Sequence, residues 1–224
     1  MSEPPDRPAD PELPAAVAAA EDHATVLDDA DLDDADLEGC VLHGLDWTGR
    51  DARGLRLSES ELRSMDLAGA KLRGARLRDV VVRDGSWANA MATEVTFSRV
   101  RFERVRLTGT DLSGSTLENV TFDDCRMDLC SFRFARFEIV RFDACRLEES
   151  DLYDSELRSV MFTNCGLSGV TLTGATFTRT EMRSCDLSGV RSPERLRGVR
   201  MPWPDVIRTA GELAAGVGIE VLDE

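Results

Sequence analysis

Residues 30–39 read ADLDDADLEG, two consecutive units of five residues that each place a leucine in the third position. Outward from this pair, every fifth residue from Leu27 to Leu187 is apolar, which makes 33 such positions without a slip of register. A repeat of five matches neither the 3.6-residue period of an α-helix nor the two-residue period of a β-strand. The chain must therefore turn a corner after every unit. We call these apolar positions the centres of the units.

A second position, two residues before each centre, also suits an interior. It mostly holds small residues, such as Ala35, Ser115, Cys125 and Val140. The other three positions of a unit are mostly polar, charged or glycine. We therefore expect two residues in every five to face a narrow core and three to face outward.

The units at residues 30–34, 35–39, 110–114 and 185–189 resemble the A-(D/N)-L-x-x unit of pentapeptide-repeat proteins. The resemblance implies an all-β solenoid, a right-handed quadrilateral β-helix in which four units form one square coil. Residues 25–190 would then make about eight coils, and at a strand spacing of about 4.8 Å these form a rod about 40 Å long.

Proline marks the expected boundaries of the β-helix. Five of the eight prolines lie in residues 1–14, and none lies between residues 15 and 192, where a missing N–H would break a coil. We expect residues 1–24 to be disordered or, near Ala15–Glu21, partly helical. No signal-peptide pattern and no membrane-length apolar run is present, so we expect a cytoplasmic protein with no membrane partner.

The cysteines and aromatic residues follow the repeat. All six cysteines fall on the small inward position, which favours a column of small apolar side chains over a disulfide or metal site. Four phenylalanines recur at every fourth centre, one in each of four successive coils, and should stack on one side. The two groups are Cys40, Cys125, Cys130, Cys145, Cys165 and Cys185, and Phe102, Phe122, Phe142 and Phe162.

Three bulky residues fit the repeat less easily. Trp47 and Trp87 are large centres, and each is followed at the next centre by an alanine, which we interpret as volume compensation. Arg50 occupies an inward position, and with Leu45 and Leu55 beside it we expect a local distortion at residues 45–55.

The period stops after Leu187, and residues 191–224 should form a helical cap with a short strand. Ser192 and Pro193 are typical of a helix start, and a longer helix is expected from Pro204 to Val217, followed by a strand at Ile219–Val221. The end resembles that of the gyrase-protecting branch of the family, whose C-terminal helix joins two rods into a dimer. The residues expected to cap or dimerise are Trp203, Val206, Ile207, Ala210, Leu213, Ala214 and Val217.

Negative charge is concentrated on part of the predicted rod. The chain carries −15, of which residues 25–190 contribute −9. Positions modulo 20 place 16 acids and seven bases on the two adjacent sides centred on the Leu27 and Leu32 columns, and 14 acids and 13 bases on the other two. The acids expected to bind a partner are Asp111, Asp128, Glu148, Glu149, Asp151, Asp154 and Asp186.

The gyrase-protecting branch is thought to mimic duplex DNA, which implies DNA gyrase or a related type II topoisomerase as partner and protection from quinolone-like poisons. Duplex DNA of about 40 Å holds about −23, so the rod has about 40% of that charge density. The unbroken register is most similar to the loop-free mycobacterial fluoroquinolone-resistance type. Ordinary solubility is the competing explanation for the acidic excess.

Three apolar residues occupy outward positions in successive units. Leu129, Phe134 and Ile139 suggest a contact patch that Tyr153 extends, or a surface covered by the N-terminal segment or the C-terminal tail. A generic interaction scaffold with an unrelated partner is therefore the alternative function. We expect no enzyme, cofactor or metal, and no direct contact with nucleic acid, because the sequence lacks a phosphate loop and a nucleophile–base pair.

Overall fold

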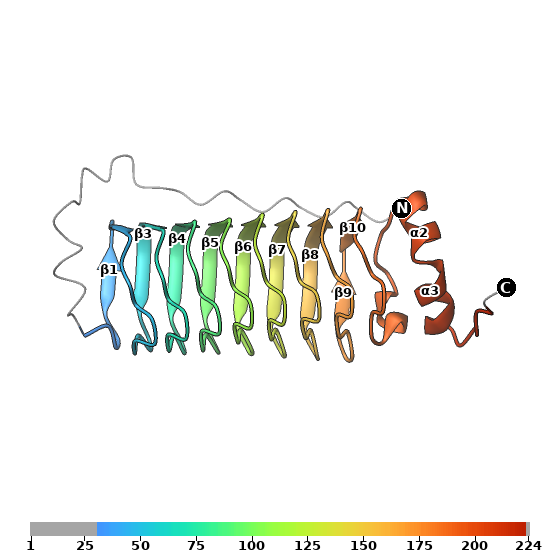
Figure 1. The fold of residues 1–224 in the computed structure, drawn as a ribbon, viewed down its shortest axis with the longest axis horizontal. Coiled ribbons are helices and arrows are strands. Elements are labelled where there is room, and N and C mark those ends of the chain that lie inside the picture. The colour runs from blue at the N-terminus through green and yellow to red at the C-terminus, as the bar shows by residue number, and fades with distance from the viewer. Residues whose placement is uncertain (1–30, 223–224) are drawn as a thin grey trace.

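The computed structural model describes residues 31–222, which form a rod of stacked parallel coils with a helical region at its C-terminal end (Figure 1). The expectations for residues 1–24, for Leu27 and for a helix at Ala15–Glu21 lie outside this range. The strands are β1 Asp36–Glu38, β2 Val41–His43, β3 Arg56–Arg63, β4 Arg76–Arg83, β5 Thr96–Glu103, β6 Thr116–Asp123, β7 Arg136–Asp143, β8 Glu156–Thr163, β9 Thr176–Thr178 and β10 Glu181–Arg183. The helices are the 3-10 helix η1 Pro193–Leu196, α2 Trp203–Arg208 and α3 Ala210–Gly216.

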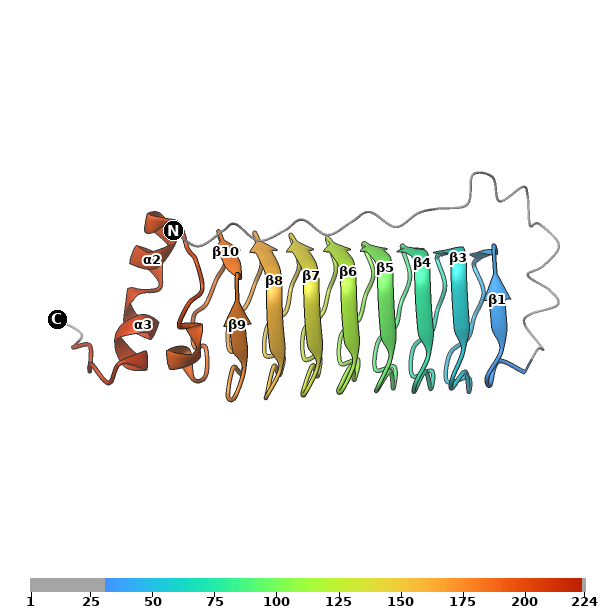
Figure 2. The ribbon, with the colours of Figure 1, turned by 180° about the vertical axis from the view of Figure 1, so that it is seen from behind.

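All neighbouring strands pair in parallel at a constant offset of four units, as Leu77 with Phe97 and Phe122 with Phe142 illustrate. The sheet path β1-β3-β4-β5-β6-β7-β8-β10 has eight levels, so about seven turns separate its first and last strands. Figure 2 shows the same regular stack from behind. Four units of five thus complete one coil, and the predicted quadrilateral β-helix is confirmed.

The core runs along the inside of the rod and consists of the two inward positions. Every centre from Leu32 to Leu187 is buried, apart from Leu37 and Phe177 near the two ends, which are half-buried. A rod of this kind buries its apolar surface only between adjacent coils, so each coil depends on the one before and after it.

The predicted phenylalanine ladder is present. Ring centroids of Phe102, Phe122, Phe142 and Phe162 lie 4.9, 4.9 and 4.8 Å apart, with interplanar angles of 9°, 5° and 3°. These distances match the strand spacing of about 4.8 Å, so the rings repeat with the backbone.

The cysteine column is also present, and all six thiols are free. Four of them stack one coil apart, and each of these donates its S–H to the carbonyl oxygen of a ladder phenylalanine, as Cys145 does to Phe122 at 3.4 Å; the four are Cys125, Cys145, Cys165 and Cys185. Burial raises the pKa of the neighbouring Cys130 to about 12. The Cys130 thiol is therefore a protonated core group at neutral pH.

The expected distortion at residues 45–55 is wrong. Bridges from Asp46 to Asp66 and from Asp51 to Lys71 keep the regular offset through this stretch. Arg50 is only half-buried, since a long side chain can bring its charged end towards water while its backbone keeps its place. Trp47 and Trp87 are 1% exposed, and the alanines that follow them are equally buried.

The corners have a backbone conformation that the sequence analysis did not predict. The last residue of every unit, from Asp34 to Gly189, has a positive φ between 50° and 76°. Glycine adopts this left-handed conformation freely, whereas other L-residues pay about 1–2 kcal/mol for it. Eleven of these corner residues are glycine, and the others hold this conformation only because the coil imposes it.

The C-terminal region differs from expectation at three points. Pro193 begins a helix, but Ser192 has φ 61° and makes no side-chain cap. The helix expected from Pro204 to Val217 is interrupted at Thr209, whose hydroxyl donates to the carbonyl of Asp205 at 2.9 Å.

The strand expected at Ile219–Val221 is wrong, because these residues close the helix instead. Gly218 has φ 81°, and the N–H of Ile219 donates back to the carbonyl of Ala214 at 2.9 Å. Leu196 and Leu213 pack against the core, so the helical region covers the last coil.

Replacing a ring of the ladder by alanine should strongly destabilise the rod. Phe142→Ala leaves a cavity between two stacked rings and should lower the free energy of unfolding by about 3–5 kcal/mol in urea denaturation. Phe177→Ala, at a half-buried centre near the end, should cost clearly less. Equal losses for the two variants would contradict the ladder as a main source of stability.

Candidate partner-binding surface

The four sides of the rod fall into two kinds, and we name them after the centres of one coil, Trp47, Ala52, Leu57 and Leu62. The Leu57 and Leu62 sides carry the continuous strands β3 to β8, whereas the Trp47 and Ala52 sides are linked between coils by single bridges. The acidic Leu27 and Leu32 columns of the sequence analysis belong to the Trp47 and Ala52 sides. We call these two the turn sides and the other two the strand sides.

Hydrogen-bonded turns shape the turn sides. In all but one of the described units on these sides, the N–H after the corner donates to the centre carbonyl, as Ala70 does to Leu67 at 3.0 Å; Val95 instead donates to the Ser115 hydroxyl at 3.2 Å. The corner then occupies the third place of a β-turn, where a positive φ favours glycine. Nine of the eleven corner glycines lie on these two sides: Gly49, Gly54, Gly69, Gly74, Gly109, Gly114, Gly169, Gly174 and Gly189.

Several acids of the turn sides support these turns. Asp111 accepts the N–H of Ser113 at 3.0 Å, and Asp186 accepts that of Ser188 at 3.0 Å. At the equivalent Asp46, hydrogen bonds from Thr48 hold the carboxyl pKa below its ordinary value. The aspartate before the centre therefore has a structural role, and its charge is only partly available to a partner.

Asp151 combines that role with an ion pair. Its Oδ1 accepts the N–H of Tyr153 at 2.9 Å, and its Oδ2 lies 2.8 Å from Nη1 of Arg133. The guanidinium of Arg133 lies over the Tyr153 ring, 4.4 Å from its centroid. The aspartate thus fixes an arginine against an aromatic ring on the Ala52 side.

Asp128 and Glu148 form a carboxyl pair on adjacent coils of the Trp47 side. Arg146 lies 3.5 Å from Asp128 and 3.6 Å from Glu148. Glu148 enters a notch at Gly166, where a Cβ atom would clash with its Oε1. Burial, together with the neighbouring Asp128 carboxyl, raises the pKa of Glu148 against the opposing effect of Arg146.

Glu149 and Asp154 are the acids most available to a partner. Both are exposed corner residues, with φ 57° and 51°. Within residues 31–222 neither side chain has a hydrogen-bond or ion-pair partner. Both side chains extend along the corner glycine of the next coil, Asp154 against Gly174 and Glu149 against Gly169, which leaves their carboxylates free to pair with a partner.

The acidic side is not uniform. Without Asp28 and Asp29, which lie outside the described residues, the turn sides hold 14 acids and seven bases. Arg106, Arg126 and Arg146 follow one another up the Trp47 side in bridged positions. On the Leu62 strand side, by contrast, charges neutralise each other, and the hydrogen bond from Arg83 holds the pKa of Glu103 below its ordinary value.

The three outward apolar residues occupy successive corners of one coil. Leu129 and Phe134, at the two edges of the Ala52 side, are 58% and 54% exposed. Ile139 is half-buried and forms the next corner, between the Leu57 and Leu62 sides, so it does not border the Ala52 side. The Phe134 ring instead contacts Tyr153 edge-on, with centroids 5.6 Å apart, so Tyr153 lies beside Phe134 as expected, and its part in a contact patch stays a prediction.

The predicted cap residues divide into two groups. Val206, Leu213 and Ala214 are half-buried, whereas Trp203, Ile207, Ala210 and Val217 are exposed. Trp203 and Val217 are the extreme cases, at 72% and 75% exposure. The end of the rod therefore presents an apolar surface that the described chain does not cover.

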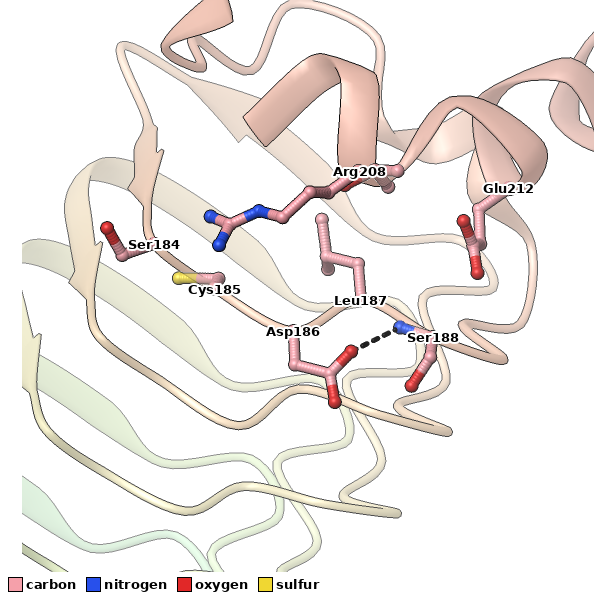
Figure 3. A pocket seen from close by; sticks show the side chains of 8 residues that line it. Ser184, Cys185, Asp186, Leu187, Ser188, Arg208 and Glu212 are labelled. Carbon is pink, nitrogen blue, oxygen red and sulfur yellow. Dashed lines mark hydrogen bonds between the residues drawn. The ribbon is translucent and has the colours of Figure 1, made fainter. Parts of the chain in front are cut away.

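A pocket of about 290 Å³ lies between the last coil and the cap (Figure 3). Arg208 reaches from the cap over Ser184 and Cys185, and Glu212 comes from the same cap one helical turn later. Asp205 pairs with Arg208 and accepts the N–H of Ser184 at 2.8 Å, which ties the cap to the coil. The arginine of this pocket already has a partner.

In the described part of the chain, no group of histidine, cysteine and acidic residues has the arrangement of a metal site. No helix among residues 31–222 is long and apolar enough to cross a membrane.

The sequence indicated the acidic columns but missed the carboxyl–glycine notch and the arginine–tyrosine contact. Both join residues that lie about one coil apart in the sequence, so a search for complementary residue types at that spacing would have found them.

Two family models match the chain. One, described as pentapeptide repeat region, matches residues 95–172, and the other, described as pentapeptide repeats (8 copies), matches residues 48–84 and 155–191. Together they span more than half of the chain. No curated protein sequence matches it.

Solved structures with similar folds share little sequence with the chain. A trypsin-treated variant of QnrB1, described as a plasmid-mediated fluoroquinolone resistance protein, is 15% identical, with 85% of this chain and 92% of that chain covered and a TM-score of 0.49. HetL, a pentapeptide repeat protein involved in heterocyst differentiation regulation from the cyanobacterium Nostoc, is 15% identical, with 74% and 91% covered and a TM-score of 0.27.

Neutralising Glu148 should stabilise the rod in a pH-dependent way. A carboxyl whose folded pKa is raised disfavours folding when it is ionised, so its cost is full above the folded pKa and disappears below the unfolded value. Glu148→Gln keeps the shape that fits the notch and should raise the urea midpoint at pH 7 but not at about pH 4. A lower midpoint at pH 7 would show that the Arg146 contact outweighs burial.

Proposed function

Because the chain belongs to the pentapeptide-repeat family, we propose that it is a non-enzymatic interaction protein that mimics duplex DNA on a type II topoisomerase, DNA gyrase. Its acidic turn sides would occupy the basic DNA-binding groove of the enzyme. In that position it would modulate gyrase or protect it from quinolone-like poisons. The observation that carries this proposal is the pair of exposed, unpaired corner carboxylates, Glu149 and Asp154, on the side with the acidic excess.

The proposal depends on the exposed charges of the turn sides and not on the total charge of the rod. Over its length the rod has about 40% of the charge density of duplex DNA, and Arg106, Arg126 and Arg146 interrupt the acidic side. Such a surface still attracts a basic groove and raises the rate of encounter. Because these charges are exposed, added salt should weaken the attraction.

The regular coil supports the comparison with the loop-free branch of the family. The one-coil offset continues through the described ladder from β1 to β10 without an inserted loop. A partner that receives the rod in its own groove would therefore contact straight sides without a protruding loop. The proposal requires no cofactor and no catalytic group, and the cytoplasmic location stays a prediction.

We also propose that the protein is a homodimer joined at its C-terminal end. Trp203, Ile207 and Val217 expose apolar surface beyond the last coil. Pairing two such ends would remove this surface from water and double the length of the acidic rod.

The generic scaffold is the second candidate function. It is favoured by Leu129 and Phe134, which are more than half exposed. A scaffold that binds through these residues would tolerate salt better than an electrostatic mimic.

Charge reversal at the two free carboxylates tests the gyrase proposal. Glu149→Lys with Asp154→Lys should weaken gyrase binding about tenfold or more and flatten its salt dependence, because attraction becomes repulsion. Asp123→Lys with Asp143→Lys makes the same net change on the Leu62 strand side and should have little effect. Binding would be measured by fluorescence anisotropy across a salt series. Equal losses in the two pairs would indicate a net-charge effect and would exclude a specific acidic face.

The dimer makes a separate prediction. Ile207→Asp places a charge in the exposed apolar surface and should convert the dimer into a monomer, as measured by sedimentation equilibrium. Glu220→Asp, near the same end but conservative, serves as control and should leave the dimer intact. A wild-type protein that sediments as a monomer at micromolar concentration would contradict the proposal.

A further inference from the structure

We propose that Leu129 and Phe134 are the anchor of a binding site, set within the acidic turn sides, for a basic protein segment that carries an apolar side chain. The inference rests on the proposed function, because it names the chemistry of the partner that the acidic side receives. It joins the electrostatic and the apolar candidates into one surface.

The backbone at these two residues is the first support. Leu129 and Phe134 have φ 59° and 60°, in turns closed by Cys130 N–H to Met127 carbonyl at 3.3 Å and Ala135 N–H to Phe132 carbonyl at 3.1 Å. A bulky residue is rarely found in this conformation, which glycine adopts freely. The fold itself would be better served by glycine at both corners.

The corner residues one coil earlier also indicate that the fold does not require bulky side chains at these positions. One coil before Leu129 and Phe134, the corners are Gly109 and Gly114, and glycine fills most other corners of the turn sides. The two bulky side chains therefore project from the surface at corners where most residues of the same column are glycine and have no side chain.

Exposure shows that the core gains little from these side chains. Leu129 is 58% and Phe134 is 54% exposed, although both stand in a conformation that costs stability. Backbone strain without compensating burial is typical of positions retained for contact with another molecule. The two residues border the same Ala52 side of one coil, with Arg133 between them, and together they offer apolar contact to a side chain of a partner.

Arg133 and Tyr153, which lie beside the two apolar corners, are held in place by contacts within the protein. Arg133 lies on the same side between the two corners, held by Asp151 and stacked on Tyr153, and the Tyr153 ring meets the Phe134 ring at an interplanar angle of 80°. A preorganised aromatic wall costs little further ordering when a partner binds.

The corner residues one coil further on indicate the charge of the partner that would bind here. Glu149 follows Leu129 and Asp154 follows Phe134 at the spacing of one coil, and both carboxylates are exposed and unpaired within the described chain. Each apolar corner is thus followed, one coil further on, by a negative charge that has no partner in the described chain. Arginine or lysine side chains flanking an apolar residue would satisfy this arrangement.

The chain's own segments match this chemistry poorly. Residues 1–24 contain six acids and one base, and a second rod would bring its own acidic side. Both would be repelled by Glu149 and Asp154. An external basic segment is therefore the occupant we infer.

Two synthetic peptides of equal length and charge test the anchor without relying on gyrase. In one, arginine alternates with leucine, and in the other with serine. The full-length protein should bind the leucine peptide about tenfold more tightly, as the loss of an interface anchor typically causes. Leu129→Gly with Phe134→Gly should abolish this preference while keeping the weaker, salt-sensitive binding common to both peptides.

Thermal unfolding of the same variants separates an anchor from a structural residue. Leu129→Gly with Phe134→Gly should leave the midpoint unchanged or raise it, because glycine relieves the corner strain. Ala144→Gly, at an exposed corner with φ 51° on the Leu62 strand side, is the matched control and should affect the midpoint in the same direction without changing the peptide preference.

Three results would overturn the inference: equal binding of both peptides by the wild type, a preference that survives in the double glycine variant, or a lowered midpoint in that variant. If the leucine-peptide preference behaves as expected but gyrase does not bind, the anchor stands and the gyrase proposal fails. If gyrase binds and the double glycine variant binds it equally well, the anchor fails and the gyrase proposal stands.

Discussion

Each coil is held to the next by the burial of its centre side chains against the equivalent centres of the adjacent coil, and the rest of the molecule depends on that contact. The Phe102–Phe162 ladder shows the constraint most clearly, since its rings repeat at the spacing of the backbone. A side chain that broke the spacing would separate two coils along the whole cross-section. The unbroken run of apolar centres is therefore what keeps the four sides straight enough to act as surfaces.

The same constraint divides the surface into sides with different properties. On the strand sides, side chains of opposite charge neutralise one another, as Arg83 and Glu103 do. On the turn sides, glycine occupies many corners and leaves them without a side chain, and aspartates such as Asp111 support the turns. The few corner residues that serve neither purpose, above all Phe134 and Glu149, are the ones that we propose as contacts for a partner.

The repeat predicted the fold, the phenylalanine ladder, the cysteine column and the acidic columns, because each follows from residue type at a fixed spacing. It did not predict the left-handed corners, which are a property of the closed coil and not of any one residue. Contacts such as Glu148 with the Gly166 notch were missed because they depend on side-chain direction between coils. The C-terminal errors came from local competition: the Thr209 hydroxyl interrupts one helix, and Gly218 turns Ile219 back onto it.

The central claim of this account is that the rod takes the place of DNA on a type II topoisomerase. The most direct test is a displacement measurement in which gyrase holds a fluorescent DNA duplex and the protein is titrated in. The account predicts that the duplex is released in proportion to the protein bound, and less readily as salt rises, because the two occupy one basic groove. A stable complex that contains gyrase, the duplex and the protein together would contradict it.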